Sequence, residues 1–311
     1  MNSYNEPMNL TVRHLQILVA AADLGSFSRG AERMGISQPA FSEAIRKIEE
    51  EIGCRLFDRT TRSLKMTVDG RNIVATARDL VRDFKIALES IRPGAGLKGP
   101  LSIAALPSIV AGVLPFALTR FNEQYPDVEV TIHDVPLARA LTMVLDGVAD
   151  IGISTDAVGH EGLRFTEVAT DQFFAVVSKR HSLQSKTQVR WKDLAAFPFI
   201  AMTGLSSIRG VTDAAFIKAD ATPKKGCEVE QILSAVALVE GGYGVTALPS
   251  LARAMFKGRN VAVRPLVDPV GYRRVGIVTL AHRKFLPAGS FMLELLEESL
   301  KAVLNKPLTK G

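Results

Sequence analysis

The sequence predicts an α/β protein with three parts: a small helical domain, one long helix and a two-lobed α/β domain. Three observations predict this order. Helical periodicity marks residues 11–52 and 67–91, a Gly- and Pro-rich segment follows at 92–100, and apolar runs of strand length then alternate with amphipathic stretches. Such alternation is typical of an α/β domain with a parallel sheet.

The bulk composition fits a globular protein of two or three domains. The chain has 311 residues, of which 47% are apolar and 23% charged. No apolar run reaches about eighteen residues and the N-terminus lacks a signal-peptide pattern, so we expect a cytoplasmic protein without a membrane partner. Cys54 and Cys227 lie in separate predicted domains without Cys or His at metal spacing, so we expect reduced thiols and no metal.

Three helices are predicted at the start of the chain. Their approximate ranges are 12–23, 27–34 and 38–52. Ser26 and Ser37 are good N-caps, and Pro39 supports the third helix because proline in a first turn loses no hydrogen bond. The tight turn before the third helix is typical of a helix-turn-helix.

The third helix has one apolar and one polar face. Its apolar stripe, which we expect to pack on the first two helices, consists of Phe41, Ile45, Ile48 and Ile52. Gln38, Ser42 and Arg46 lie on the polar face, where they suit base edges and phosphates in a DNA major groove. The alternative is the ordinary solvated face of an amphipathic helix.

A basic segment follows the third helix. Residues 55–71 contain five basic residues and two aspartates, and the stretch "RLFDRTTRSLKMT" within them is hairpin-like. A hairpin after a helix-turn-helix can form a wing that contacts phosphates or a minor groove. The order of elements therefore predicts a winged helix-turn-helix domain at residues 1–66.

These motifs resemble the N-terminal domain of the LysR-type transcriptional regulators. The most specific matches are "GSFSRGAERMGISQPAFSEAIRKIEEEIG" and "LFDRTTRSLKMTVDG". The resemblance implies a double-stranded DNA partner, bound in the major groove and at the backbone or minor groove. The residues that it implies are Ser37, Gln38, Pro39, Ser42 and Arg46 for the major groove, and Arg59 and Arg62 for the wing. Glu43 departs from the basic or neutral residue of many members, and an acid facing phosphate would weaken nonspecific binding.

A heptad pattern predicts a linker helix at residues 67–92. Its apolar residues are spaced 4, 3, 4, 3 and 4 apart, and they are Ile73, Ala77, Leu80, Phe84, Ala87 and Ile91. The helix either packs on its own domain or pairs with a second copy. The resemblance implies pairing, and with it a roughly palindromic operator, a homodimer or dimer of dimers (a homotetramer), and RNA polymerase as a further partner.

Residues 93–100 are the predicted hinge and residues 101–311 the predicted effector-binding regulatory domain. We expect lobe 1 at about 101–167 and 273–311, and lobe 2 at about 168–272. The stretches "FNEQYPDVEV" and "VEGGYGVTALP" resemble the regulatory half of the LysR-type family. That resemblance implies the fold of type 2 periplasmic binding proteins, with a ligand cleft between two lobes.

Hydroxyl-bearing residues at the predicted cleft indicate a small-molecule effector. First turns of helices attract anions, and hydroxyls lie at two such turns. The candidate effector-binding residues are Ser108, His133, Thr155, Thr203, Ser206 and Ser207. The alternative is that the hydroxyls only cap helices. No buried arginine is expected at these turns, so the case for an organic acid depends on dipoles and hydroxyls alone.

No enzyme motif accompanies these features. The sequence lacks G-x-S-x-G, H-E-x-x-H, C-x-x-C and G-x-x-x-x-G-K-[ST], and its five histidines show no ligand spacing. We therefore expect no catalytic residues and no cofactor. We interpret the sequence as a DNA-binding transcriptional regulator with an effector cleft. The alternative is a cytoplasmic solute-binding or enzymatic α/β protein with an incidental helix-turn-helix.

Overall fold

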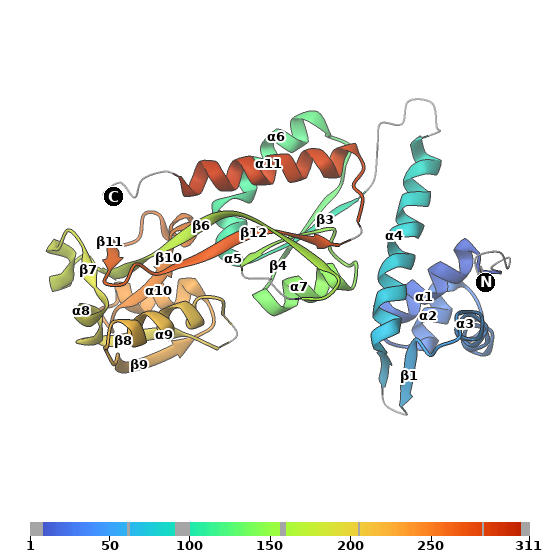
Figure 1. Ribbon diagram of the computed structural model, residues 1–311, viewed down its shortest axis with the longest axis horizontal. Coiled ribbons are helices and arrows are strands. Elements are labelled where there is room, and N and C mark those ends of the chain that lie inside the picture. Colours follow the sequence, from blue (N-terminus) through green and yellow to red (C-terminus); the bar gives the residue numbers. More distant parts are fainter. Residues whose placement is uncertain are drawn as a thin grey trace, which may run out of the picture. The chain divides into compact units, whose positions relative to one another are not determined.

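The computed structural model describes residues 9–60, 63–90, 100–155, 160–204, 206–281 and 283–305. The contacts between residues divide the chain into two compact units (Figure 1). The first unit consists of residues 1–100 with the short segments 127–129 and 145–148, and the second of all other residues. Within the described ranges, no helix combines the length and the apolar character that crossing a membrane requires.

The first unit contains the predicted three helices, a hairpin and a long helix. Its elements are α1 (Val12–Leu24), α2 (Phe27–Met34), α3 (Gln38–Ile52), β1 (Phe57–Thr60), β2 (Ser63–Met66) and α4 (Val68–Ser90). The hydroxyls of Thr11, Ser26 and Ser37 cap the first three helices by accepting backbone N–H groups. Gly35 ends α2 with a φ of 65°, a conformation that glycine adopts without strain, and so allows the turn into α3.

The apolar stripe of α3 forms part of the core of this unit. Phe41, Ile45 and Ile48 are completely buried, and Ile52 packs against the same core while remaining partly exposed. This burial confirms the expected packing. On the other side of α3, Glu49 holds the hairpin, because its Oε1 accepts hydrogen bonds from the backbone N–H groups at 56 and 57, at 2.8 and 3.1 Å.

The first half of the predicted seam on α4 packs within its own unit. Ala77 is 2% exposed and belongs to the core that contains the α3 stripe, and Ile73 packs against that core. The start of α4 covers apolar surface on α1. The assignment of Ile73 and Ala77 to the dimerisation seam is therefore corrected, because these residues form or contact the core of the first unit.

The second half of α4 leaves an apolar stripe exposed. Leu80, Phe84 and Leu88 are 52%, 47% and 51% exposed and follow one another at intervals of four residues. Leu88 was not part of the predicted seam. Ile91 lies outside the described residues, as does the side chain of Ala87. We call Leu80, Phe84 and Leu88 the α4 stripe.

The second unit is built on an eight-stranded mixed sheet. The strand order is β4-β3-β5-β12-β6-β11-β7, and β10 also pairs with β6. The bounds are β3 (Leu101–Ala105), β4 (Val130–Asp134), β5 (Ile151–Thr155), β6 (Leu163–Ser178), β7 (Val189–Arg190), β10 (Thr246–Pro249), β11 (Val261–Val267) and β12 (Tyr272–Leu280). The strand β6 is continuous over 16 residues and runs antiparallel to β12.

Two groups of helices lie on this sheet. Lobe 1 contains β3–β5 with α5 (Pro107–Gly112), α6 (Leu114–Gln124), α7 (Leu137–Leu145) and α11 (Pro287–Leu304). In lobe 1, α6 and α11 lie side by side over one face of the sheet (Figure 1). The helical stretch between β3 and β4 is divided into α5 and α6, because Pro115 fits a first turn but not a helix interior.

Lobe 2 has its own apolar core, which extends from Phe173 to Leu266. Besides β7, β10 and β11, it contains a second, two-stranded parallel sheet of β8 (Pro198–Met202) and β9 (Lys224–Val229). Its helices are α8 (Trp191–Ala195), α9 (Arg209–Lys218) and α10 (Ile232–Glu240), with two 3₁₀ turns, η2 (Ser182–Ser185) and η3 (Ser250–Phe256). The sequence did not predict β11, α8 or η3. The antiparallel strands β6 and β12 link the two lobes.

Candidate functional site

The polar face of α3 is accessible to a ligand. Ser37, Gln38 and Pro39 are exposed, and Ser42 is partly exposed. The Gln38 amide Nε2 donates a hydrogen bond to the Ser42 hydroxyl at 3.1 Å, one turn along the helix. This contact orients the amide along the helix and leaves Gln38 exposed to solvent.

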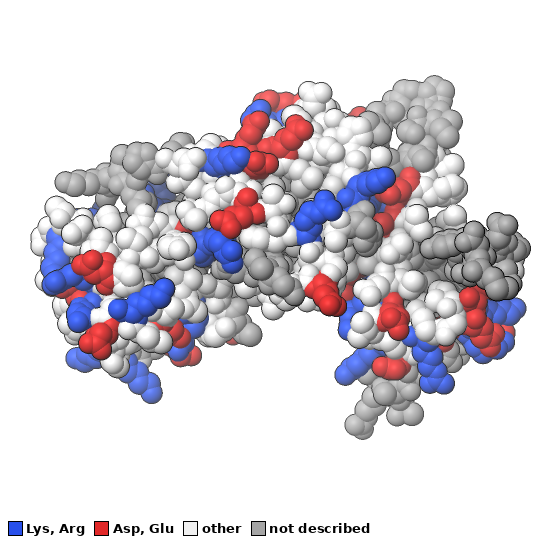
Figure 2. All heavy atoms as spheres, viewed as in Figure 1, with Lys and Arg blue, Asp and Glu red and all other residues white. Residues whose placement is uncertain are grey.

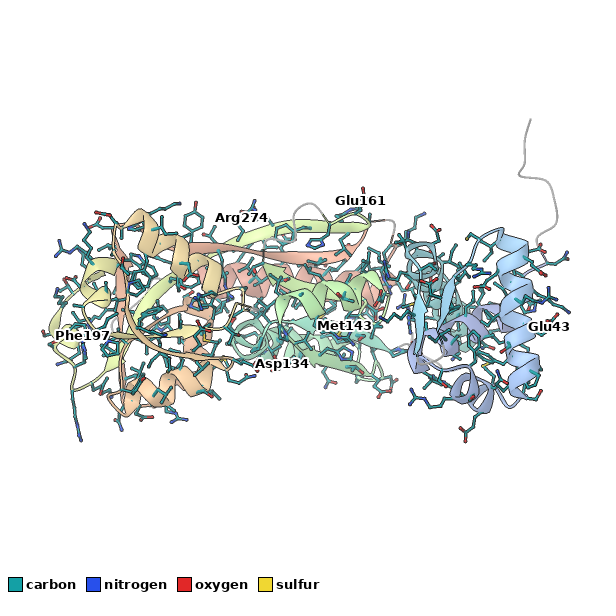
Figure 3. The ribbon with its side chains drawn as sticks, turned by 90° about the horizontal axis from the view of Figure 1, so that it is seen from below. Glu43, Asp134, Met143, Glu161, Phe197 and Arg274 are labelled. Carbon is teal, nitrogen blue, oxygen red and sulfur yellow. The ribbon has the colours of Figure 1, made fainter. Side chains whose placement is uncertain are left out.

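Arg46 is held by two carboxylates of its own helix. It donates two hydrogen bonds to Glu43, at 2.6 and 2.9 Å, and a third to Glu50. The contact with Arg46 lowers the pKa of the Glu43 carboxyl, and both carboxylates raise the pKa of the guanidinium. Glu43, labelled on the surface of α3 in Figure 3, thus points along the helix toward Arg46. Three of the five N–H groups of the guanidinium are thus occupied within α3.

The wing carries the remaining predicted DNA contacts. Arg59 lies on β1, but its side chain lies outside what the structure describes, as does the whole of Arg62. On the face shown in Figure 2, basic and acidic side chains are intermixed in both units. The positive net charge of the chain therefore does not by itself identify a DNA-binding surface.

A cavity of about 230 Å³ lies between the two lobes of the second unit. Lobe 1 lines it with residues after β3 and β4, and lobe 2 with residues after β8 and β9. The lining residues are Leu106, Pro107, Ser108, Asp134, Pro136, Leu137, Met202, Thr203, Ser206, Ser207, Ile208, Glu230, Gln231, Ile232 and Arg273. The carboxyl ends of strands in α/β sheets commonly form ligand sites of this kind.

A buried ion pair lies at the base of this cavity. Arg273 on β12 and Asp171 on β6 are paired across the two strands, and their side chains are 1% and 0% exposed. The guanidinium Nε and Nη2 donate to Asp171 Oδ2 at 3.1 and 2.9 Å. The other oxygen, Oδ1, accepts from the hydroxyl of Ser250 at 2.6 Å and from the N–H of Leu251 at 3.2 Å.

Arg273 also connects one serine from each lobe. Its Nη2 donates to the hydroxyl of Ser108 at 2.7 Å, and its Nη1 donates to the hydroxyl of Ser207 at 3.0 Å. Because each hydroxyl accepts from the guanidinium, its own proton points away from Arg273 and is free to donate elsewhere. The expectation that no buried arginine lies at these turns was wrong.

The other predicted cavity residues divide into two groups. Thr203 and Ser206 line the cavity. His133 and Thr155 do not, and this corrects their assignment. His133 Nε2 lies 3.0 Å from the Ser102 hydroxyl on the neighbouring strand, and Thr155 is 2% exposed within β5. Successive side chains of a strand point to opposite faces, so the residue after His133, Asp134, lines the cavity instead.

The expected position of the lobe 2 hydroxyls in the first turn of a helix is also corrected. The first turn of α9 begins at Arg209, after Thr203, Ser206 and Ser207, and α5 is only six residues long. The hydroxyls therefore lie in the segment that precedes α9, not in its first turn. The charge that organises this site comes from Arg273.

Comparison with known proteins gives matches for both units. Residues 12–71 match the family described as "Bacterial regulatory helix-turn-helix protein, lysR family", and residues 94–301 match the "LysR substrate binding domain". A relative in Escherichia coli strain K12, the HTH-type transcriptional regulator YbhD, is 30% identical over 283 residues, which cover 91% of this chain and 89% of the relative.

Solved structures share the fold over nearly the whole chain. A full-length OxyR variant from Pseudomonas aeruginosa superposes with a TM-score of 0.75 at 21% identity, covering 97% of this chain and 99% of that one. Full-length CbnR, crystallised with its target DNA, gives a TM-score of 0.57 at 21% identity, covering 93% of this chain and 99% of CbnR. With both domains matched in order, the chain belongs to the LysR family of DNA-binding transcriptional regulators.

Proposed function

We propose that this regulator responds to a small organic acid that binds in the cavity between its two lobes. The observation that carries the proposal is the position of Ser108 and Ser207 on one guanidinium. Each lobe thereby presents a hydroxyl donor to the same cavity, and a ligand carboxylate has the acceptor oxygens that two such donors require. Thr203 and Ser206 add hydroxyls on the side of lobe 2.

A ligand that contacts both lobes can act as a switch. Its affinity depends on the spacing of the lobes, because hydrogen bonds to both lobes form only at one spacing. Binding therefore favours that spacing, and the difference in affinity between the two arrangements sets how far the equilibrium shifts. No catalytic step is part of this proposal.

On the DNA side, Gln38 and Ser42 are the proposed readers of base edges. Ser37, Pro39, Arg46, Arg59 and Arg62 are the proposed contacts to the groove walls and phosphates. The α4 stripe is the proposed dimerisation seam, which would place two copies of α3 on a roughly palindromic operator. We also propose that the dimers associate into a dimer of dimers, that RNA polymerase is a further partner, and that the protein acts in the cytoplasm.

The first prediction concerns the two serines. A thermal-shift screen of small organic acids identifies an effector, which at about a hundred times its Kd adds about 2.7 kcal/mol of stability. Ser108→Ala and Ser207→Ala should each weaken effector binding by about tenfold or more, because each removes a hydrogen bond to a charged group. Calorimetry measures this. Thr142→Val, which removes an exposed hydroxyl on α7, is the matched control and should change nothing. Unchanged affinity in both serine variants would exclude these hydroxyls from the site.

The second prediction separates base contacts from phosphate contacts. Gln38→Ala should cost about 1–3 kcal/mol on the operator and little on random DNA, whereas Arg46→Ala should weaken both. Glu43→Gln, which frees Arg46 from a carboxylate, should strengthen binding to random DNA. Mobility shifts over a range of salt concentrations measure these affinities, with Arg120→Ala on α6 as a charge-matched control for Arg46→Ala. Direct readout by Gln38 is wrong if Gln38→Ala weakens operator and random DNA equally.

The third prediction tests the α4 stripe. Leu80→Asp combined with Phe84→Asp should abolish the dimer formed through α4, because two helices cannot bury unpaired charges between them. Light scattering gives the mass. Lys85→Asp on the same helix also changes the net charge by −2 and should leave the mass unchanged. A double variant that keeps both its mass and its operator affinity would show that α4 does not pair through this stripe.

A further inference from the structure

Two carboxylates also line the cavity, and the pairing of the serines with Arg273 does not account for them. Asp134 at the end of β4, on lobe 1, and Glu230 between β9 and α10, on lobe 2, both line it (Figure 3 labels Asp134). Neither carboxylate has a hydrogen bond or an ion pair with another described residue. Both residues are exposed to solvent, and the partial burial of Asp134 raises the pKa of its carboxyl.

The charges around the cavity do not balance. Among the described residues that line it, Arg273 is the only basic one, and Asp171 already pairs with it. Asp134 and Glu230 therefore have no basic partner among these residues, and both are open to solvent. A ligand that brought only a carboxylate would add a further acidic group to the cavity, which like-charge repulsion opposes.

We infer that the ligand carries a protonated amine as well as a carboxylate, and so has the chemistry of an amino acid. The inference depends on the proposed organic-acid site. The carboxylate accepts from the hydroxyls of Ser108 and Ser207, and the ammonium group donates to Asp134 and Glu230. An ammonium has three donors and no acceptor, so it suits two carboxylates that have no other partner.

The size and lining of the cavity restrict the ligand further. Its volume of about 230 Å³ is below the range of about 300–1,000 Å³ that holds drug-sized ligands. A single amino acid is compatible with this volume. Leu137 from lobe 1 and Ile232 from lobe 2 give the cavity apolar walls, which favour an aliphatic rather than a charged side chain.

The same arrangement explains how such a ligand would close the lobes. Each lobe contributes one hydroxyl donor and one carboxylate, so without a ligand the two carboxylates oppose the approach of the lobes. An ammonium group between them replaces this repulsion by attraction. A ligand with both charges thus favours the closer spacing through its ammonium group and its carboxylate, whereas a simple acid does so through its carboxylate only.

The test uses three matched sets of compounds and the full-length protein. Calorimetry compares the common amino acids, the same acids without the α-amino group, and the same amines without the carboxylate. We expect one or more amino acids to bind, with both matched analogues at least about tenfold weaker. Asp134→Asn and Glu230→Gln should each weaken amino-acid binding by about tenfold or more, and should leave the matched acid unchanged or bound more tightly.

A matched control and three contrary outcomes complete the test. Glu123→Gln on α6 removes the same charge outside the cavity and should change no affinity. A matched acid that binds as tightly as its amino acid, with no effect of Asp134→Asn, overturns the inference but leaves the organic-acid site in place. An amine that binds as tightly as its amino acid also overturns the inference. If no compound of the three sets binds, both the inference and the proposed site are wrong.

Discussion

The buried ion pair between Arg273 and Asp171 is the interaction on which the arrangement of the regulatory unit depends. It joins β6 and β12, the two strands that link the lobes, and each partner also makes hydrogen bonds to residues outside these strands. Arg273 holds a serine of each lobe, while Asp171 accepts from the start of η3. Removing one partner of such a pair costs about 3–5 kcal/mol, because a charge is left buried without compensation. The pair therefore fixes the position from which both lobes meet a ligand.

The guanidinium groups of Arg273 and Arg46 differ in their exposure to solvent and in their hydrogen-bond partners. The side chain of Arg273 is buried, and its guanidinium orients the hydroxyls of Ser108 and Ser207. A ligand in the cavity would therefore accept hydrogen bonds from neutral hydroxyls. Arg46 on α3 is exposed but occupied by Glu43 and Glu50, so DNA must compete for it. Exposed pairs of this kind are weak, and the exchange is readily made where a phosphate is well placed. Under the proposed function, the first arrangement would favour a defined ligand geometry, and the second would weaken binding to DNA that offers charge alone.

The order of the helices and strands could be predicted from the sequence, but the role of Arg273 in the cavity could not. Periodicity and capping residues predicted α1–α4, and the serines were selected because hydroxyls were expected in the first turns of two helices, although Ser207 lies before α9. Arg273 was missed because its partners lie 66, 102 and 165 residues away, although the pair Arg273–Arg274 opens a strand, where alternation turns one of the two inward. The same alternation of side chains along β4 explains why Asp134, and not His133, lines the cavity. Heptad spacing could not show that the first seam positions complete a core, since that depends on packing against α1.

The central claim is that the ion pair holds segments of both lobes, and hydrogen–deuterium exchange of the full-length protein tests it without a ligand. Asp171→Asn should speed exchange in α5, in residues 206–209 and in η3, and leave α1–α3 unchanged. Glu167→Gln, which alters the exposed pair with Arg274 on the same two strands, is the control and should have little effect. Faster exchange confined to β6 and β12, or no change in either lobe, would contradict the claim.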